Sequence, residues 1–362
     1  MTKCVRNPIL QNGMLPVDIV LHPSWWYTHV GITFDEDFFY NPVRRVEAER
    51  KMAQVLYDRF GEYGLGAGHS QDLPIVGAVH NAAGYLLSEM LGCTVDYIQN
   101  AAPQVIPGDI DPLSIDVDRA FESRAFKRFE KLAEALKTRY GYLTGDVNWA
   151  GILNVALDLR GQVILMDFFD RPDDVHEFFA RIAQTIERFT SGIKSETGTT
   201  SISVNRNVRH LKGPIFLHSE CSHTMISEAQ YEEFLFSFDV EWGQKYRPFG
   251  IHFCGSDPDR YAGVFARLPH LDFLDVGWGG DVRKLREFLP MTFLNIRLDP
   301  VSIVNQSVEE IRSTMRRLVQ DSNNPYLTGV CCINMDDQVG DDKIVAILRT
   351  AAELRCQYAA EA

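Results

Sequence analysis

The chain has 362 residues, and its hydrophobic content of 45% is enough for the core of one large domain or two average ones. The 36 Lys and Arg against 49 Asp and Glu leave a net charge of −13, which argues against partners such as nucleic acid or an anionic membrane surface. The sequence has neither an apolar run of about 18 residues that would span a bilayer nor a signal-peptide pattern, so we expect a cytoplasmic protein.

Residues 1–70 predict an N-terminal extension that is helical and rich in aromatic side chains. Residues 44–60 have the periodicity of an amphipathic helix. Upstream of them stand Trp25, Trp26 and Tyr27, in a stretch with further Phe and Tyr residues. Two interpretations stay open for these aromatic side chains: a packed lid or homodimer contact, or a substrate-binding surface on which an apolar ligand stacks.

The middle of the chain predicts strands and helices in a less regular order. Residues 73–79 and 143–147 resemble strands, each of which leads into a helix, at 80–91 and 152–159. Two longer amphipathic helices are predicted at residues 119–140 and 173–189.

The last 150 residues alternate regularly between strand and helix. Short apolar runs, as expected of strands covered on both faces, lie at 214–220, 250–254, 271–276, 292–297 and 326–334. Each is followed by a helical pattern, at 227–242, 257–268, 281–288, 307–320 and 341–355. Ser307 and Glu310 have the form of a capping box at the start of one of these helices.

About eight strand–helix units in a chain of this length predict an α/β fold of the TIM (β/α)8 barrel type. We expect the barrel domain to span residues 71–362, with residues 1–70 packed on it as the extension. A doubly wound open sheet is the alternative, but no G-x-G-x-x-G turn follows a predicted strand.

Polar and sulfur-containing residues gather at the predicted carboxyl ends of the strands, where TIM barrels carry out their chemistry. In chain order these residues are Asp146, Glu220, His252, Cys254, Asp275, Arg297, Asp299, Cys331 and Cys332. Residues two apart on a strand face the same way, so His252 and Cys254 would offer two ligands to one metal. A thiolate from Cys331 or Cys332, which face opposite ways, would complete a three-ligand zinc site with a fourth position open.

The same residues also have a purely structural interpretation. Cysteine is among the most buried residue types, and a buried histidine commonly makes a hydrogen bond. Glu220 is either a fourth ligand or a catalytic base beside the metal, and its structural alternatives are to cap the region of Ser227 or to hold a hydrogen bond beside the site. The seven cysteines show no disulfide-like spacing, so we expect reduced thiols, some of them bound to metal.

The motifs resemble those of the uroporphyrinogen decarboxylase superfamily, and most closely its zinc- and corrinoid-linked methyltransferases. The His-x-Cys followed at long range by Cys matches His252, Cys254 and Cys331. The segment from Leu294 to Pro300 is similar to the Asn-(Leu/Val)-Asp-Pro segment of the superfamily. The resemblance covers residues 140–356. The Arg-rich N-terminal segment of true uroporphyrinogen decarboxylases is absent, which disfavours an octa-carboxylate substrate.

The resemblance implies a zinc-dependent methyltransferase whose corrinoid is carried by a separate protein. The expected reaction moves methyl from a small methylated substrate, preferably an aromatic or other methyl ether, to Co(I). Asp146, Asn148 and Arg297 would position polar groups of the substrate, with Asp146 as a catalytic carboxylate. The alternatives are transfer from methylcobamide to a thiol, a decarboxylase-like lyase, and a non-catalytic binding protein on the same scaffold.

Overall fold

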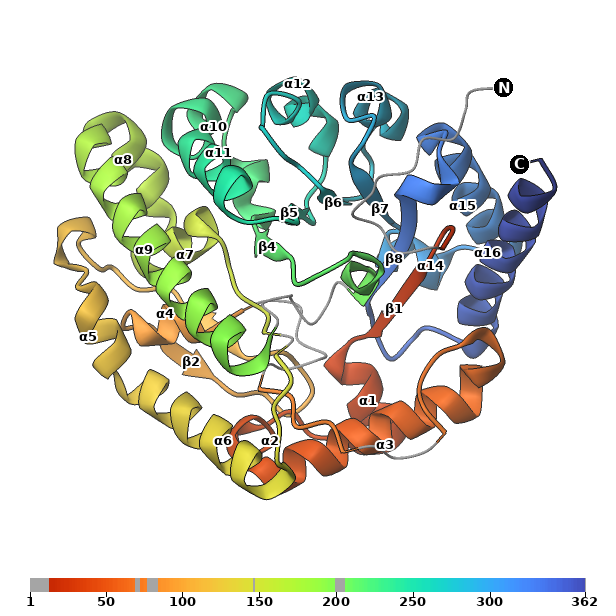
Figure 1. Cartoon of the computed structure of the whole chain (residues 1–362), viewed down its shortest axis with the longest axis horizontal. Coiled ribbons are helices and arrows are strands. Elements are labelled where there is room, and N and C mark those ends of the chain that lie inside the picture. Colours follow the sequence, from red (N-terminus) through yellow and green to blue (C-terminus); the bar gives the residue numbers. More distant parts are fainter. Residues whose placement is uncertain (1–12, 69–71, 77–83, 146, 199–205, 362) are drawn as a thin grey trace.

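A curled sheet of six parallel strands forms the centre of the computed structural model, which describes residues 13–68, 72–76, 84–145, 147–198 and 206–361 (Figure 1). Across the sheet the order is β1 (Val17–Leu21), β8 (Thr328–Met335), β7 (Phe293–Arg297), β6 (Phe273–Val276), β5 (Phe249–Phe253) and β4 (Phe216–Ser219). Over the described residues the sheet does not close into a barrel. The predicted α/β fold with a curled parallel sheet is thus confirmed. The predicted closure into a (β/α)8 barrel is not confirmed.

The five strands predicted in the last 150 residues are all present, within two residues of their expected ends. The two strands predicted upstream are not: the described residues there make only isolated parallel bridges, Ile75 with Thr144 and Ala150 with Ser219. Residues 77–83 and 146, which belong to those predicted strands and to the helix predicted at 80–91, lie outside the described residues. The bridge between Ala150 and Ser219 is parallel, so the segment at Ala150 nevertheless extends the parallel sheet beyond β4, its last strand.

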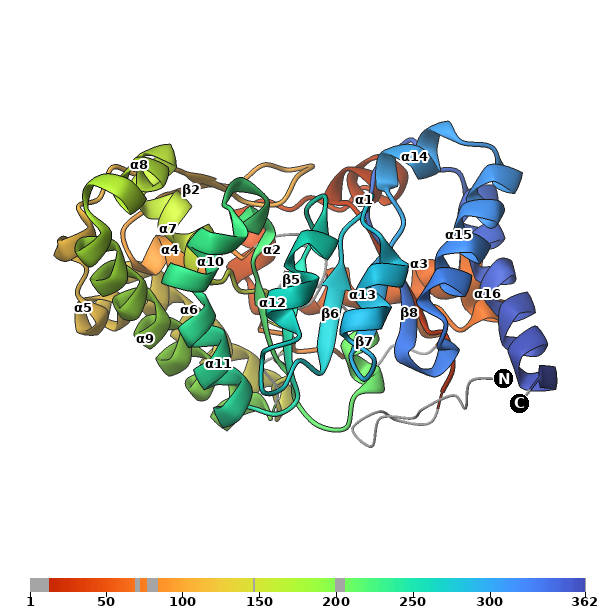
Figure 2. The same cartoon turned by 90° about the horizontal axis from the view of Figure 1, so that it is seen from above.

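The helices that follow the strands cover the outer side of the sheet (Figures 1 and 2). They are α10 (Glu228–Phe234), α11 (Phe236–Lys245), α12 (Ala262–Phe265), α13 (Val282–Phe288), α14 (Pro300–Asn305), α15 (Val308–Ser322) and α16 (Asp341–Glu361). The helix predicted at 227–242 is divided at Leu235, and α14 was not predicted. The capping box of Ser307 and Glu310 is confirmed at the start of α15.

The first half of the chain adds helices around the other side of the molecule (Figure 1). They are α1 (Pro23–Val30), α2 (Glu36–Tyr40), α3 (Pro42–Phe60), α4 (Leu86–Met90), α5 (Val117–Glu122), α6 (Arg124–Tyr140), α7 (Ile152–Arg160), α8 (Ile164–Asp170) and α9 (Pro172–Thr197). A small antiparallel hairpin joins β2 (Thr94–Asp96) to β3 (Gln104–Ile106). None of the helices in the described part of the chain is long and apolar enough to cross a membrane.

Short 3₁₀ helices complete the described structure. They are η1 (Gly61–Tyr63), η2 (Pro112–Ser114), η3 (Gly161–Val163), η4 (Arg206–His210), η5 (Cys221–Met225), η6 (Pro258–Tyr261) and η7 (Pro325–Leu327). The helix predicted at 119–140 is divided into α5 and α6 because Ser123 caps the second of them with its side chain. Residues 17–21, within the expected extension, form β1 and pair with β8.

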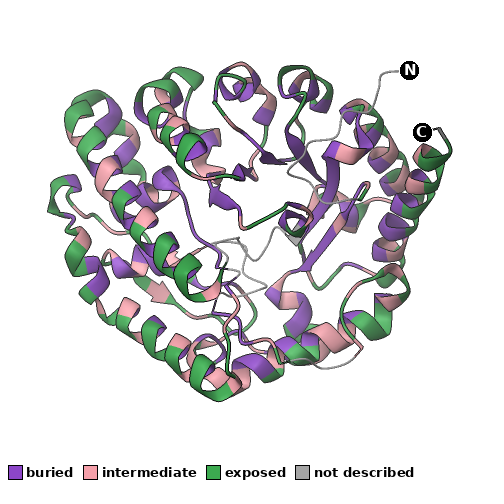
Figure 3. Ribbon diagram, viewed as in Figure 1, coloured by how far each residue is buried: buried purple, intermediate pink, exposed green. Residues whose placement is uncertain are grey.

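Buried apolar side chains form two clusters, which meet at β1 and β8, and the strands are the most uniformly buried part of the chain (Figure 3). Along β8 the side chains alternate between them. Cys331 belongs to the larger cluster, whereas Cys332 packs in the second cluster with residues of α15 and α16. The two adjacent cysteines therefore face opposite sides of the sheet, as the two-residue period of a strand requires.

Candidate metal centre

Cys221, His252 and Cys254 come together where two neighbouring strands end. Ser219 of β4 is in register with His252 of β5, so the residues just past both strands lie side by side. Cys221 begins η5 and is separated from β4 by Glu220 alone, and Cys254 directly follows β5. One potential ligand atom from each of the three residues lies within 4.8 Å of the others. The imidazole of His252 is buried and both cysteines are half-buried.

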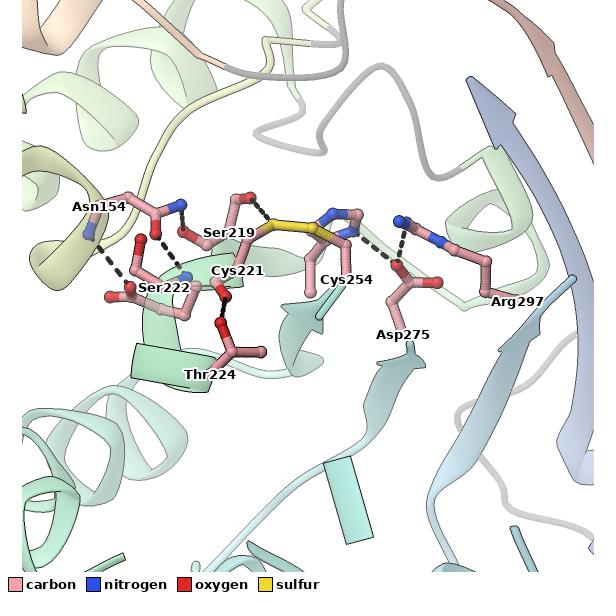
Figure 4. Close-up of a disulfide and its surroundings, with 10 residues drawn as sticks. Asn154, Ser219, Cys221, Ser222, Thr224, Cys254, Asp275 and Arg297 are labelled. Atoms are coloured by element: carbon pink, nitrogen blue, oxygen red, sulfur yellow. Dashed lines mark hydrogen bonds and ion pairs between the residues drawn. A yellow bond between two sulfur atoms is a disulfide. The ribbon is translucent and has the colours of Figure 1, made fainter. Parts of the chain in front are cut away.

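The two cysteines are joined by a disulfide, and their Cα atoms are 5.0 Å apart (Figure 4). The expectation of reduced thiols is therefore wrong for this pair in the structure. The physical reason is the parallel register of β4 and β5, which brings together two cysteines that are 33 residues apart in the chain. Linear spacing does not show such a proximity.

Asp275 of β6 fixes the orientation of His252. Its Oδ2 lies 2.7 Å from Nδ1 of His252 and also accepts a hydrogen bond of 2.7 Å from Arg297. Asn295 donates to the other carboxylate oxygen at 3.0 Å. A carboxylate that holds one ring nitrogen of a histidine leaves the other ring nitrogen to serve as a metal ligand.

The surroundings of His252 favour the neutral form of its imidazole ring. Burial lowers the pKa of His252, and it does so more strongly than the nearby Asp275 raises it. For Asp275 burial opposes ionisation, but Arg297 and His252 outweigh it, so the pKa of the carboxyl group is lowered. Neutral imidazole is the form of histidine that binds metal.

Glu220 makes its contacts with the start of α7. Its carboxylate accepts hydrogen bonds from the backbone N–H groups of Leu153, at 3.2 Å, and Asn154, at 3.4 Å. A Cβ atom on Gly151 would lie 2.3 Å from Oε1 of Glu220, so this approach requires glycine. Glu220 thus links β4 to α7, and it is outside the Cys221–His252–Cys254 group.

Two buried histidines flank Glu220. His218 is 3.0 Å from Asp239, and its pKa is raised to about 9 because Asp239 and Glu220 outweigh the opposing effect of burial. Burial dominates for His223, so its pKa is lowered, and its ring packs among aromatic side chains such as Tyr231 and Tyr261. His218 and Asp239 therefore form a buried pair next to Glu220.

Cys331 lies elsewhere, within β8, and its side chain is fully buried in the larger apolar cluster. It interacts with Arg297 and Asp275, and burial raises the pKa of its thiol well above the ordinary value. Of the described residues, the Cys/His group that can hold a metal does not include Cys331. Arg297 therefore contacts protein groups on two sides, Asp275 and Cys331.

The other predicted substrate-binding residues are dispersed. Trp25 and Trp26 are completely buried in the second apolar cluster, which is the packed alternative considered above, while Tyr27 is 40% exposed. Asn148 is buried close to the bridge between Ala150 and Ser219. Asp146 lies outside the described residues.

The residue that the sequence analysis missed is Cys221. The signal was present, since Cys221 follows a predicted strand that immediately precedes the strand of His252. Sequential parallel strands commonly lie side by side, so the residues after both deserve to be considered together.

The chain shares its fold with a methyltransferase from Methanosarcina mazei. The two structures align with a TM-score of 0.67 over 95% of each chain, at 13% sequence identity. No protein-family model matches the sequence, and no curated protein matches it. The comparison thus establishes a methyltransferase-like fold, in which Cys221, His252 and Cys254 form a group that can hold a metal ion.

Proposed function

We propose that the protein is a zinc-dependent methyltransferase that moves a methyl group from a small methylated substrate to the Co(I) corrinoid of a partner protein. The observation that carries the proposal is the convergence of Cys221, His252 and Cys254 at adjacent strand ends. In the reduced state, two thiolates and one neutral imidazole are the ligand types of a zinc site that keeps a position open. The shared fold with a methyltransferase supports the same reaction class.

The residues of the chain have distinct roles in this proposal. Cys221, Cys254 and His252 would hold the zinc, and Asp275 would keep the imidazole oriented through Nδ1. When bound, zinc supplies Lewis acidity that weakens the bond between the methyl group and its heteroatom. Glu220 anchors the backbone before Cys221 to α7 and so positions the ligand loop.

A cavity of about 680 Å³ at the carboxyl ends of β1 and β8 is our candidate for the substrate-binding side of the molecule. Its lining includes His22, Asp158 and Asp336, and it opens at the edge of the sheet that also carries the cysteines. The preference for an aromatic methyl ether depends on an aromatic cluster that begins with Trp25, Trp26 and Tyr27. Tyr27 is 40% exposed, but Trp25 and Trp26 lie in the apolar core. Because both are buried, they give it no support, and the proposal is a small methylated substrate in general.

The test combines metal analysis with an activity screen on protein purified under reducing conditions. We expect about one zinc per chain in the wild type and in Cys356→Ser, whose cysteine is exposed on α16, but little zinc in Cys254→Ser. Methylation of Co(I) cobalamin is then screened with methyl ethers, methylamines and methyl thioethers. Absence of zinc from the reduced wild type would refute the proposal, and metal-independent release of carbon dioxide from a carboxylated substrate would favour the lyase.

A further inference from the structure

The sulfur atoms that would bind zinc are the same two that form the disulfide Cys221–Cys254 (Figure 4). The zinc-bound state and the disulfide-bonded state therefore exclude each other. Sulfur atoms that share one tetrahedral zinc lie roughly 3.8 Å apart, given the usual Zn–S distance. A disulfide also removes the negative charge that makes each thiolate a ligand.

The backbone around the two cysteines is held by close packing. A Cβ atom on Gly277, after β6, would lie 1.7 Å from the carbonyl oxygen of Gly255, and a Cβ atom on Gly255 would lie 1.9 Å from Cγ2 of Thr224. The hydroxyl of Thr224 donates to the carbonyl oxygen of Cys221 at 3.1 Å (Figure 4). The two cysteine-bearing loops are therefore held close together by contacts other than the disulfide.

Among the described cysteines, Cys221 and Cys254 are two that are accessible to an oxidant and already lie within bonding reach of each other. Cys221 and Cys254 are half-buried, whereas Cys93, Cys331 and Cys332 are buried. Burial raises the pKa of the Cys93 thiol to about 11, and it raises that of the Cys331 thiol well above the ordinary value. Thiols of this kind react slowly because the thiolate is the nucleophile. Exposed Cys356, on α16, is free in the structure.

We propose that Cys221 and Cys254 form a redox switch on the metal centre, a regulation that rests on the function proposed above. One thiolate attacks a small-molecule disulfide and displaces its first thiol, and the second cysteine then attacks the mixed disulfide and displaces the other. The two cysteines lose two electrons in total, the oxidant takes up two electrons and two protons from solvent to leave as two thiols, and zinc is released. A dithiol reductant reverses both steps and restores the ligands.

The experiment uses the full chain, loaded with zinc under reducing conditions and then treated with 2-hydroxyethyl disulfide. Peptide mapping should identify the Cys221–Cys254 bond, and the zinc content should fall at least tenfold. A dithiol together with added zinc should break the Cys221–Cys254 bond and restore the zinc content. Cys356→Ser and Cys331→Ser should behave as the wild type, because neither cysteine belongs to the pair.

The outcomes separate this inference from the proposed function. Zinc that stays bound while Cys221 and Cys254 remain reduced would overturn the switch and leave the methyltransferase proposal standing. A reduced protein that binds no zinc would overturn both, even where the disulfide still forms. Zinc that is released while another cysteine pair becomes oxidised would also overturn the switch as assigned here.

Discussion

Two regions of the sheet carry cysteines, and their surroundings differ sharply. At the carboxyl ends of β4 and β5, Cys221 and Cys254 are half-buried, on segments that follow the strands. Within β8, Cys331 and Cys332 are fully buried. The residue type is the same in both regions. What differs is the position of the cysteines along the strands. At the carboxyl edge of the sheet, Cys221 and Cys254 have both access to solvent and the potential ligand His252 beside them.

The largest effect is expected when one cysteine in each region is replaced by serine and the zinc affinities of the two variants are compared. We expect Cys221→Ser to weaken zinc binding by more than the ~10–100-fold that follows loss of a group supporting a ligand, because it removes a ligand itself. Cys331→Ser should retain about one zinc per chain. Competition with a chromogenic chelator under reducing conditions measures both affinities. Loss of zinc from Cys331→Ser, with Cys221→Ser unaffected, would reverse the assignment.

The next test concerns the support of His252 by Asp275. Asp275→Asn should lower zinc affinity by roughly 10–100-fold, because the amide is a weaker partner for the imidazole than the carboxylate. The matched control is Asp272→Asn, which removes a buried carboxylate paired with Arg247 at 2.7 Å, before β6 begins. Both variants should lower the melting temperature, but only Asp275→Asn should change the zinc affinity. Equal zinc affinities in the two variants would contradict the role of Asp275.

A smaller effect is expected for a buried cysteine that lies outside the metal-binding group. Cys331→Ala should reduce the free energy of unfolding by about 1–2 kcal/mol, as is typical for a mutation that leaves a small cavity. Cys356→Ala, on the exposed surface of α16, should stay within about 0.5 kcal/mol of the wild type. Urea denaturation of the reduced proteins measures both. Similar values for the two variants would show that Cys331 has no packing role.

The smallest expected effect is a pH dependence at Asp158, which lines the cavity at the same edge of the sheet. Burial raises the pKa of Asp158 to about 6, and the hydroxyl of Ser88 only partly opposes this. The folded state therefore disfavours the ionised carboxylate, so its cost is full above pH 6 and is relieved as the pH falls from 6 towards 4. Asp158→Asn should raise the melting temperature at pH 7.5 by more than at pH 4.5. An equal shift at both values would contradict the raised pKa.

The sequence by itself determined the alternating second half of the molecule. Five apolar runs became β4 to β8, and the capping box at Ser307 marked the start of α15. Such features depend on local residue periodicity, which a single chain displays directly. His252 and Cys254 were also identified from the sequence, because a two-residue spacing on one strand has a definite geometric consequence.

Only the tertiary structure decided which cysteine joins them. The register of β4 with β5 brings Cys221 to Cys254, whereas Cys331 lies beside Arg297. The tertiary structure also places Trp25 and Trp26 in a buried cluster and includes residues 17–21 in the sheet as β1. The physical reason is common to all of these: contacts between distant segments depend on strand order and register, and neither is contained in the local pattern of any one segment.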